Sequence, residues 1–364
     1  MTKIVISGYY GFANAGDEAM LSALVTSLRE YISDAEITVI SGNPAMTGAN
    51  HQVRTVHRFN LPGIVAAVRS CQILISGGGS LLQDVTSARS IYYYLFIIRL
   101  AEFFGKPVML YAQGIGPVTR PRARKAVRSV LQKVQMIGVR DADSQTELEV
   151  MGVTAPPIYV TADAVLSMRP ADREIGAAIL QSRNLKDRRK KIGIAVRDWQ
   201  GLTTYKKALA ESADALYRLY EGQIVFIPMQ YPADSATAKE IMSYMECPAV
   251  SLESAYSAAE LMSLLGAMDV VIANRLHALV FASLMGVPVT AISYDPKIDS
   301  FINLIGEKIC GTVDTIRAEA IVADAAAKLA AGAQRREVKE KLDALRRRSL
   351  QNADLAVQAL HRKG

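Results

Sequence analysis

The chain has 364 residues, half of them hydrophobic and 21% charged, and carries a net charge of +7. This length favours two domains, and this composition is that of an ordered globular protein. The apolar run at residues 91–98 is far too short to span a bilayer, so we expect no transmembrane helix. The widely spaced cysteines Cys71, Cys247 and Cys310 argue against a disulfide framework. Together with a start that lacks a signal-peptide pattern, they predict a cytoplasmic protein.

Positive charge gathers in three stretches of the sequence. The Arg and Lys residues concerned lie within residues 120–128, 183–191 and 335–363. Such clusters suit an anionic membrane surface or a nucleic acid, and they also occur as solvated helix faces. Aromatic residues do not interleave with them and no nucleic-acid-binding motif is present, so we expect no nucleic acid partner.

The first half of the sequence alternates short apolar runs with helical segments. A strand at residues 3–7 leads into the loop 8–18 and a helix at 19–31. Another helix is predicted at residues 91–104, and further strands are predicted at residues 36–41, 72–76, 107–112, 136–139 and 158–161. This rhythm predicts a parallel, doubly wound sheet. The loop lacks the G-x-G-x-x-G spacing and the ribose-binding acid of dinucleotide domains, so no such cofactor is expected.

The loops that follow these strands carry glycines and polar side chains. Gly77, Gly78 and Gly79 in a row remove side chains where a ligand or another backbone must approach, and Asp84 follows them. A second loop of this kind begins at Gln113. Neither loop has the Lys and Ser/Thr of a P-loop, which argues against ATP hydrolysis.

Acidic residues stand at the starts of two predicted helices. Asp17 and Glu18 precede the helix at residues 19–31, where they either cap it or serve a site. Asp141 and Asp143 resemble a metal-binding D-x-D, but capping of the helix that follows is the better interpretation. We therefore expect no metal site.

A polar stretch at residues 167–191, which contains a proline and ends in a basic run, marks a domain boundary. Beyond it the strand–helix alternation resumes. The predicted organisation is an N-terminal Rossmann-like domain (1–168), an interdomain segment (169–191), a C-terminal Rossmann-like domain (192–334) and a basic C-terminal helix (335–364) that could pack back on the first domain. Two doubly wound domains of this kind predict a GT-B-like fold in which the domains face each other across a cleft.

One junction in the second domain concentrates the chemistry. A strand at residues 269–273 delivers Asn274, Arg275 and His277 to the start of a buried helix, and Arg197 follows another strand in the same way. Ligands of open α/β sheets bind at the carboxyl ends of strands, and a helix N-terminus attracts anions. An Arg at a strand end can also be a surface residue and a single His structural, so the pattern alone leaves both interpretations open.

Five motifs, taken in order, resemble those of the polysaccharide pyruvyl transferases, over essentially the whole chain. They are Gly8-Tyr9-Tyr10-Gly11 with residues 14–18, Gly77-Gly78-Gly79 with Gln83-Asp84, Gln113-Gly114-Ile115-Gly116-Pro117, Arg140-Asp141 with Ser144, and Arg275-Leu276-His277-Ala278. The resemblance is nearest to the CsaB-type cell-wall branch, whose product anchors S-layer proteins. It implies a GT-B-like fold, phosphoenolpyruvate as donor, and a 4,6-linked pyruvate ketal on N-acetylmannosamine of a lipid-linked secondary cell-wall polymer precursor.

The residues of the second domain suit a small anionic donor. The carboxylate and the phosphate of phosphoenolpyruvate fit two separate guanidiniums, those of Arg197 and Arg275. The backbone N–H of Leu276 adds a donor. His277 is the candidate general acid that protonates the enol methylene, and Arg275 would stabilise the departing phosphate.

The first domain is expected to hold the acceptor sugar. Asp17 or Glu18 is the candidate base for the attacking hydroxyl. The predicted acceptor-binding residues are Asn14, Gly16, Asp17, Gly78, Gly79, Asp84 and Gln113. The scheme requires no metal and no cofactor, and the basic clusters would meet an anionic membrane surface where a lipid-linked precursor resides.

Two alternatives remain open at this stage. A GT-B glycosyltransferase that uses a nucleotide sugar would need an acid for the ribose, and Asp295 or Glu253 could supply it. A non-catalytic carbohydrate-binding protein would have no need of His277 at an anion site. His51 and His57 match no motif and are assigned no role.

Overall fold

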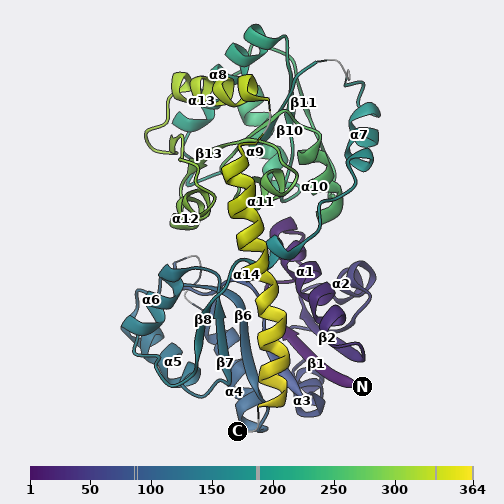
Figure 1. The fold of residues 1–364 in the computed structure, drawn as a ribbon, viewed down its shortest axis with the longest axis vertical. Coiled ribbons are helices and arrows are strands. Elements are labelled where there is room, and N and C mark those ends of the chain that lie inside the picture. The colour runs from purple at the N-terminus through teal and green to yellow at the C-terminus, as the bar shows by residue number, and fades with distance from the viewer. Residues whose placement is uncertain (86, 88, 186–188, 333, 363–364) are drawn as a thin grey trace. The chain divides into compact units, whose positions relative to one another are not determined.

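The computed structural model describes residues 1–364 apart from residues 86, 88, 186–188, 333 and 363–364. The chain divides into two compact units (Figure 1). Unit 1 comprises residues 1–12, 17–168 and 345–364, and unit 2 comprises residues 13–16 and 169–344. Each unit has its own parallel sheet, which confirms the predicted α/β class. Lys186, Arg188 and Lys363 of the basic stretches lie outside the described residues.

Unit 1 alternates strands and helices for most of its length. Its elements, in chain order, are β1 (Thr2–Ser7), α1 (Ala15–Tyr31), β2 (Ala35–Ser41), α2 (Pro44–His51), β3 (Arg54–His57), α3 (Leu61–Ser70), β4 (Ile73–Ser76), β5 (Gly79–Leu82), α4 (Ser90–Phe103), β6 (Val108–Ile115), α5 (Pro121–Leu131), β7 (Met136–Val139), α6 (Ala142–Val150), β8 (Ile158–Val160) and the 3-10 helix η1 (Ala164–Ser167). The segment between β2 and β4 thus holds two helices and a strand that the sequence pattern did not reveal, and all three are short.

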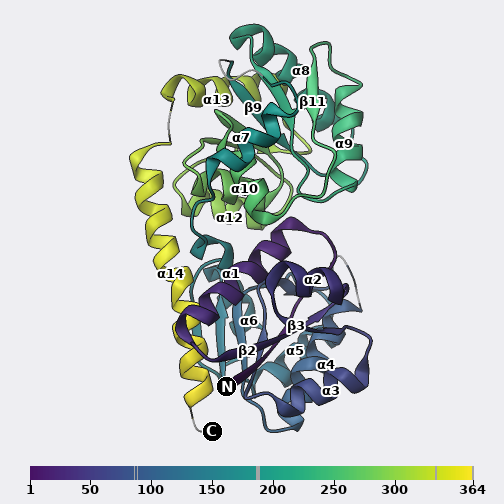
Figure 2. The ribbon, with the colours of Figure 1, turned by 90° about the vertical axis from the view of Figure 1, so that its right-hand side faces the viewer.

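The unit-1 sheet has the strand order β3-β2-β1-β4-β6-β7-β8, and β5 pairs separately with β6. Its order reverses between β1 and β4, where ligands of such sheets bind. One face packs on α3, α4 and α5, with buried Val5, Leu74 and Leu110 among the strand residues. Figure 2 shows those helices on one side of the sheet and α1 with the C-terminal part of α14 on the other. The doubly wound sheet predicted for this part of the chain is therefore confirmed.

Unit 2 repeats the plan with a smaller sheet. Its elements are α7 (Arg173–Gln181), β9 (Lys191–Ala195), α8 (Thr204–Tyr220), β10 (Gln223–Phe226), α9 (Ala233–Met242), β11 (Ala249–Ser251), α10 (Ala258–Gly266), β12 (Val270–Ala273), α11 (Leu276–Leu284), β13 (Val289–Ser293), α12 (Pro296–Leu304), β14 (Gly311–Thr312) and α13 (Ala318–Ala331). The strand order is β11-β10-β9-β12-β13-β14, so the reversal falls between β9 and β12. Helices α8, α9 and α13 cover the face whose core includes Ile194, Phe226 and Ile272.

The segments at both predicted domain boundaries contain helices. Residues 169–191, expected between the domains, are counted with unit 2, where α7 packs against α10. The last helix, α14 (Arg336–His361), is divided: residues 336–344 are counted with unit 2 and the remainder with unit 1.

A buried amide fastens the C-terminal part of α14 to the unit-1 sheet. The Oδ1 atom of Asn352 accepts hydrogen bonds from the backbone N–H of Ala112 (3.2 Å) and the hydroxyl of Thr161 (2.9 Å), and its Nδ2 donates to the C=O of Ala162 (3.3 Å). Ala112 has a φ of 49°, within the stretch of β6 where the register with β7 shifts. Asn352 therefore satisfies a backbone group that the irregular strand leaves without a ladder partner.

Replacing Asn352 with Ala is expected to lower the free energy of unfolding by about 2–4 kcal/mol, because it leaves buried hydrogen-bond donors and acceptors of the sheet without partners. The exposed neighbour substitution Gln351→Ala should change it by less than about 0.5 kcal/mol. Chemical denaturation of the full chain, followed by circular dichroism, measures both. Equal effects of the two substitutions would contradict the anchoring role.

Candidate functional site

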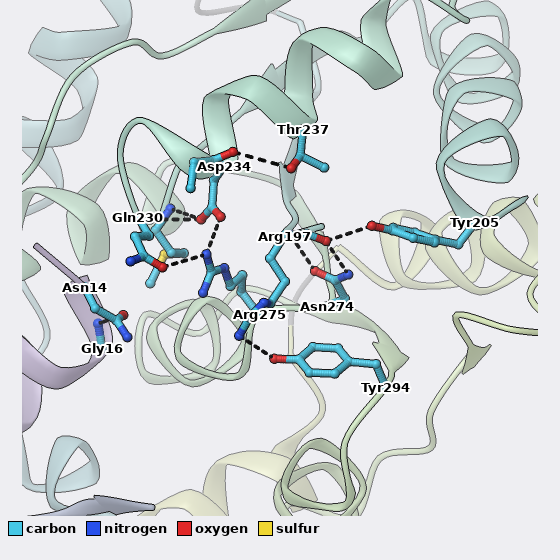
Figure 3. Close-up of polar contacts among 12 residues, drawn as sticks. Asn14, Gly16, Arg197, Tyr205, Gln230, Asp234, Thr237, Asn274, Arg275 and Tyr294 are labelled. Atoms are coloured by element: carbon cyan, nitrogen blue, oxygen red, sulfur yellow. Dashed lines mark hydrogen bonds and ion pairs between the residues drawn. The ribbon is translucent and has the colours of Figure 1, made fainter. Parts of the chain in front are cut away.

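Two polar residues stand at the switch point of the unit-2 sheet. β9 and β12 are paired neighbours, and Arg197 and Arg275 follow their carboxyl ends. Buried Asn274 links the two: its Oδ1 accepts from the N–H of Arg197 (2.9 Å) and its Nδ2 donates to the C=O of the same residue (3.2 Å) (Figure 3). This pair of bonds fixes the backbones of both arginines at the ends of neighbouring strands, whereas the sequence indicated only that each arginine follows a strand.

Arg275 is buried and held by an ion pair. Only 8% of the residue is exposed, and its Nη2 contacts the carboxylate of Asp234, which is 3% exposed. The second oxygen of Asp234 accepts the N–H groups of Met229 (3.0 Å) and Gln230 (2.9 Å) (Figure 3). A buried charge requires such compensation. The Nε of Arg275 is also buried and has no hydrogen-bond partner within the described residues.

Arg197 is held by an aromatic ring. Its guanidinium carbon lies 5.5 Å from the ring centroid of Tyr294, and its Nη1 donates to the hydroxyl of the same tyrosine (3.3 Å). The C=O of Arg197 accepts from the hydroxyl of Tyr205 (2.8 Å). As in Arg275, the Nε is buried and no partner for it is found among the residues that the structure describes. Arg197 is thus preorganised without a carboxylate on its guanidinium.

The residue after Arg197 is fixed by a buried lysine. Lys206 is 2% exposed and pairs with Asp198 (2.6 Å) and Glu240 (2.7 Å). The hydrogen bond from Lys206 is the main cause that lowers the pKa of Asp198. Because this carboxylate stays ionised and bound, the loop that carries Arg197 has a rigid second support.

His277 lies in the first turn of α11, next to the N-cap residue Arg275. Gly16 packs directly against its imidazole, since a Cβ on that glycine would lie 2.1 Å from Nδ1. The segment that carries Gly16 is tied to the loop after β10 by a bridge between Asn14 and Gln230 and by the bond from Ala15 N–H to the C=O of Met229 (3.0 Å). Asn14 and Gly16, predicted to bind the acceptor, are therefore counted with unit 2, beside the predicted donor residues.

The glycine triplet of unit 1 lies at the switch point of its sheet. The N–H of Gly77 donates to the C=O of Ser7 at the end of β1 (2.7 Å), and Gly79 begins β5 with a φ of 94°. A Cβ on Gly79 would lie 3.4 Å from an Oδ1 of Asp17, and one on Gly78 would lie 3.2 Å from the sulfur of Met20. The close approach expected of these glycines is thus an approach to α1, whose first turn carries Asp17.

Asp84 and Gln113 are buried polar residues of unit 1. The carboxylate of Asp84 accepts from the N–H of Thr119 and of Arg120, both at 2.8 Å, and from the hydroxyl of Thr119 (3.0 Å). Burial alone would raise the pKa of Asp84, but these bonds outweigh it and lower the pKa. Gln113 accepts from the hydroxyl of Ser76 (3.2 Å), while its buried Nε2 has no partner in the described part of the chain. Asp84 therefore shapes a turn, whereas Gln113 keeps a donor for another group.

Glu18 is fully engaged within its own loop. One carboxylate oxygen accepts from the N–H of Gly11 (2.8 Å), and the other lies 3.1 Å from Nε2 of His51. His51, which no motif had singled out, thus supports the loop after β1.

Sequence reasoning missed Asp234 and Tyr294 as partners of the arginines. Asp234 lies in the first turn of α9 and Tyr294 directly follows β13, so both occupy positions after strands, which is the signal that could have found them. The acids proposed for a nucleotide ribose are engaged elsewhere: Asp295 caps α12 and pairs with Lys297 (3.1 Å), and Glu253 pairs with Lys239 (2.8 Å).

Solved structures similar to this chain share its fold at low sequence identity. The S. aureus MnaA–UDP complex has a TM-score of 0.67 at 11% identity, covering 98% of this chain and 95% of that one. The UDP-GlcNAc 2-epimerase from Neisseria meningitidis gives 0.65 at 11% identity, with 98% and 100% covered. A glycosyltransferase from Rickettsia africae gives 0.64 at 12% identity, with both chains covered completely. These likenesses confirm two Rossmann-like domains of the GT-B class.

The sequence identifies the family. The model of the family described as polysaccharide pyruvyl transferase matches residues 14–296, and the chain belongs to that family. The amylovoran biosynthesis protein AmsJ of Erwinia amylovora is 22% identical in an alignment of 356 positions that covers 81% of this chain and 84% of AmsJ. Both findings support the predicted pyruvyl transfer to a polysaccharide. Across the described residues, each helix is either too short or too polar to cross a membrane.

The ion pair between Arg275 and Asp234 should be strongly coupled. Asp234→Ala and Arg275→Ala are each expected to cost about 3–5 kcal/mol of unfolding free energy, because each leaves a buried charge without its partner. The double variant should cost less than the sum of the two. Urea denaturation of the four proteins measures the coupling, and the exposed pair Arg218–Glu246 is the control, for which no coupling is expected. Additive effects at Arg275 and Asp234 would contradict a structural ion pair.

Proposed function

We propose that the chain transfers the pyruvyl group of phosphoenolpyruvate to two hydroxyls of one sugar, forming a 4,6-pyruvate ketal and releasing phosphate. The observation that carries this proposal is the pair of guanidiniums fixed at adjacent strand ends beside His277 and the start of α11. Phosphoenolpyruvate has two anionic groups on one small skeleton, and such a ligand fits two rigid cations better than one.

The donor groups of the site match the two anionic groups. The Nε atoms of Arg197 and Arg275 are the donors that lack internal partners among the described residues. The first N–H groups of α11, including that of Leu276, have no intrahelical acceptor and add to the attraction of a phosphate. Because Asp234 already balances the charge of Arg275, the net attraction for the donor rests on Arg197 and the helix end.

His277 supplies the proton in this proposal. The imidazolium protonates the methylene carbon while a sugar hydroxyl attacks the neighbouring carbon, so a methyl group and a C–O bond form together. Phosphate then leaves, stabilised by Arg275, and the second hydroxyl closes the ketal. Of the two hydroxyl protons released, one replaces the proton given to the methyl group and the other leaves on phosphate. The scheme uses no metal and no cofactor.

Asp17 is the better candidate for the base. Glu18 has a partner on each carboxylate oxygen, in Gly11 and His51, and serves the loop. Asp17 faces the backbone of Gly79 at the switch point of the unit-1 sheet. It also directly follows Gly16, which packs on the imidazole of His277.

The acceptor in this proposal is N-acetylmannosamine of a lipid-linked secondary cell-wall polymer precursor that serves S-layer anchoring. The reaction would take place in the cytoplasm, at the inner face of the plasma membrane. The exposed arginines Arg120, Arg122 and Arg128 on and beside α5 are suited to an anionic lipid surface. Sedimentation with liposomes that shows no preference for anionic lipid would remove the membrane contact from the proposal.

The donor-site variants test the proposal through phosphate release from phosphoenolpyruvate in the presence of an N-acetylmannosaminyl disaccharide acceptor. Arg197→Ala should raise the KM for phosphoenolpyruvate by about 10- to 100-fold, as expected for the loss of a charged hydrogen bond. Arg275→Lys, which preserves the charge beside Asp234, should raise it as well because the Nε donor is lost. His277→Ala should lower kcat by about 10²- to 10⁴-fold.

The surface variant Arg218→Ala is the control and should match the unsubstituted protein. Full activity of His277→Ala would rule out His277 as the general acid. Unchanged affinity for phosphoenolpyruvate in both arginine variants would rule out Arg197 and Arg275 as the donor site.

The two adjacent acids can be separated with isosteric amides. Asp17→Asn should lower kcat by at least about 100-fold with little change in the KM for phosphoenolpyruvate, as expected for the loss of a general base. Glu18→Gln should retain most of kcat while lowering the melting temperature, because it weakens the pairing with His51. Steady-state kinetics and thermal unfolding distinguish the two, and the reverse pattern would transfer the role of base to Glu18.

A further inference from the structure

Arg58 of unit 1 is a cation held among aromatic rings. Its guanidinium carbon lies 5.2 Å from the ring centroid of Phe12, 5.0 Å from that of Phe59 and 4.9 Å from that of Tyr93. Phe12 in turn stacks on Tyr9, with centroids 4.2 Å apart and planes 11° from parallel. Arg58 directly follows β3, so the cluster stands at the carboxyl edge of the sheet, on the same edge as the loop after β1.

The cluster is built by backbone bonds on both sides of the arginine. The N–H of Arg58 donates to the C=O of Ser41 at the end of β2 (2.9 Å), and its C=O accepts from the hydroxyl of Tyr93 (3.2 Å). Gly42 lets the ring of Phe12 lie against the chain, because a Cβ there would be 2.6 Å from Cζ of that ring. The position of the guanidinium is therefore set before any ligand binds.

In the described part of the chain, no carboxylate pairs with the guanidinium of Arg58. Within the described residues the guanidinium of Arg58 faces rings, and its buried Nε has no hydrogen-bond acceptor. The rings beside it are open to solvent, with Tyr9 38% and Phe59 74% exposed. An unpaired guanidinium next to exposed aromatic faces can bind an acidic group and the apolar face of a sugar ring together.

Two charges act on the hydroxyl of Tyr9. Partial burial is the main cause that raises the pKa of Tyr9, the charge of Asp17 raises it further, and Arg58 lowers it.

We propose that Arg58, with the rings of Tyr9, Phe12 and Phe59, is an acceptor subsite that selects a glycan bearing an acidic group next to the sugar that is pyruvylated. The acidic group is either the carboxylate of a uronic acid or the phosphate that links the sugar to its carrier, since a guanidinium binds both in the same bidentate way. The inference rests on the proposed function for the identity of the acceptor, but the binding it describes does not require phosphoenolpyruvate.

Binding of three probes to the full chain, measured by isothermal titration calorimetry, tests the subsite: a neutral methyl hexoside, the matching methyl hexosiduronic acid and the matching hexosyl methyl phosphate. The unsubstituted protein should bind at least one acidic probe more tightly than the neutral one. Arg58→Gln should weaken that binding by about tenfold or more, as expected for a lost charged hydrogen bond, and leave the neutral probe within about twofold. The preferred acidic probe identifies the source of the charge.

Arg69→Gln, at an exposed arginine of α3, is the matched control and should leave all three affinities unchanged. Phosphoenolpyruvate binding by Arg58→Gln should equal that of the unsubstituted protein, which also shows that the variant is folded. Equal binding of acidic and neutral probes by the unsubstituted protein, or an acidic preference that survives Arg58→Gln, overturns the subsite. If phosphoenolpyruvate fails to bind the unsubstituted protein while the acidic preference is present, the proposed function fails and the subsite stands.

Discussion

The buried ion pair between Arg275 and Asp234 is the constraint on which the chemistry of unit 2 depends. A guanidinium this deeply buried would be costly if its charge were not balanced, and Asp234 balances it while accepting two backbone N–H groups of its own. The pairing engages Nη2 of the guanidinium, while the buried Nε has no partner within the described residues. Asn274 fixes the backbone of Arg197 through two hydrogen bonds. The proposed donor site would therefore be rigid before a ligand binds, and a rigid site loses less entropy on binding.

Two glycines help to position the proposed acid and base, because their lack of a side chain allows close contact with the backbone. Gly16 permits the imidazole of His277 to lie against the chain, and Gly79 does the same for Asp17. A Cβ at Gly16 would collide with the imidazole ring, and a Cβ at Gly79 would come within 3.2 Å of Met20. The proposed acid and the proposed base are thus each packed on backbone, which limits the rotamers that they can adopt.

The sequence predicted the strand–helix alternation of both units well, because apolar runs of strand length alternate with helical segments. It also led to Arg197, Arg275 and His277, because strand ends and helix starts can be located along the chain. It did not reveal Asp234 or Asn352, since their partners lie 41 and 240 residues away and only the folded sheet brings them together. No element was predicted between β2 and β4, where α2 and α3 have only 8 and 10 residues.

The two arginine environments show why burial decides how a cation is held. Arg275 is nearly inaccessible to water, so its charge needs a carboxylate, and part of its attraction for an anion is lost to that partner. Arg58 is half-buried and keeps contact with water, so aromatic rings suffice to hold it and its full charge remains for a ligand. A small donor that must be oriented suits the first arrangement, because direction matters more there than net charge. A larger acceptor that must first be attracted to the protein suits the arrangement of Arg58, because a cation without a carboxylate partner attracts an acid over a longer distance. On this argument the chain would recognise its donor by geometry and its acceptor by charge.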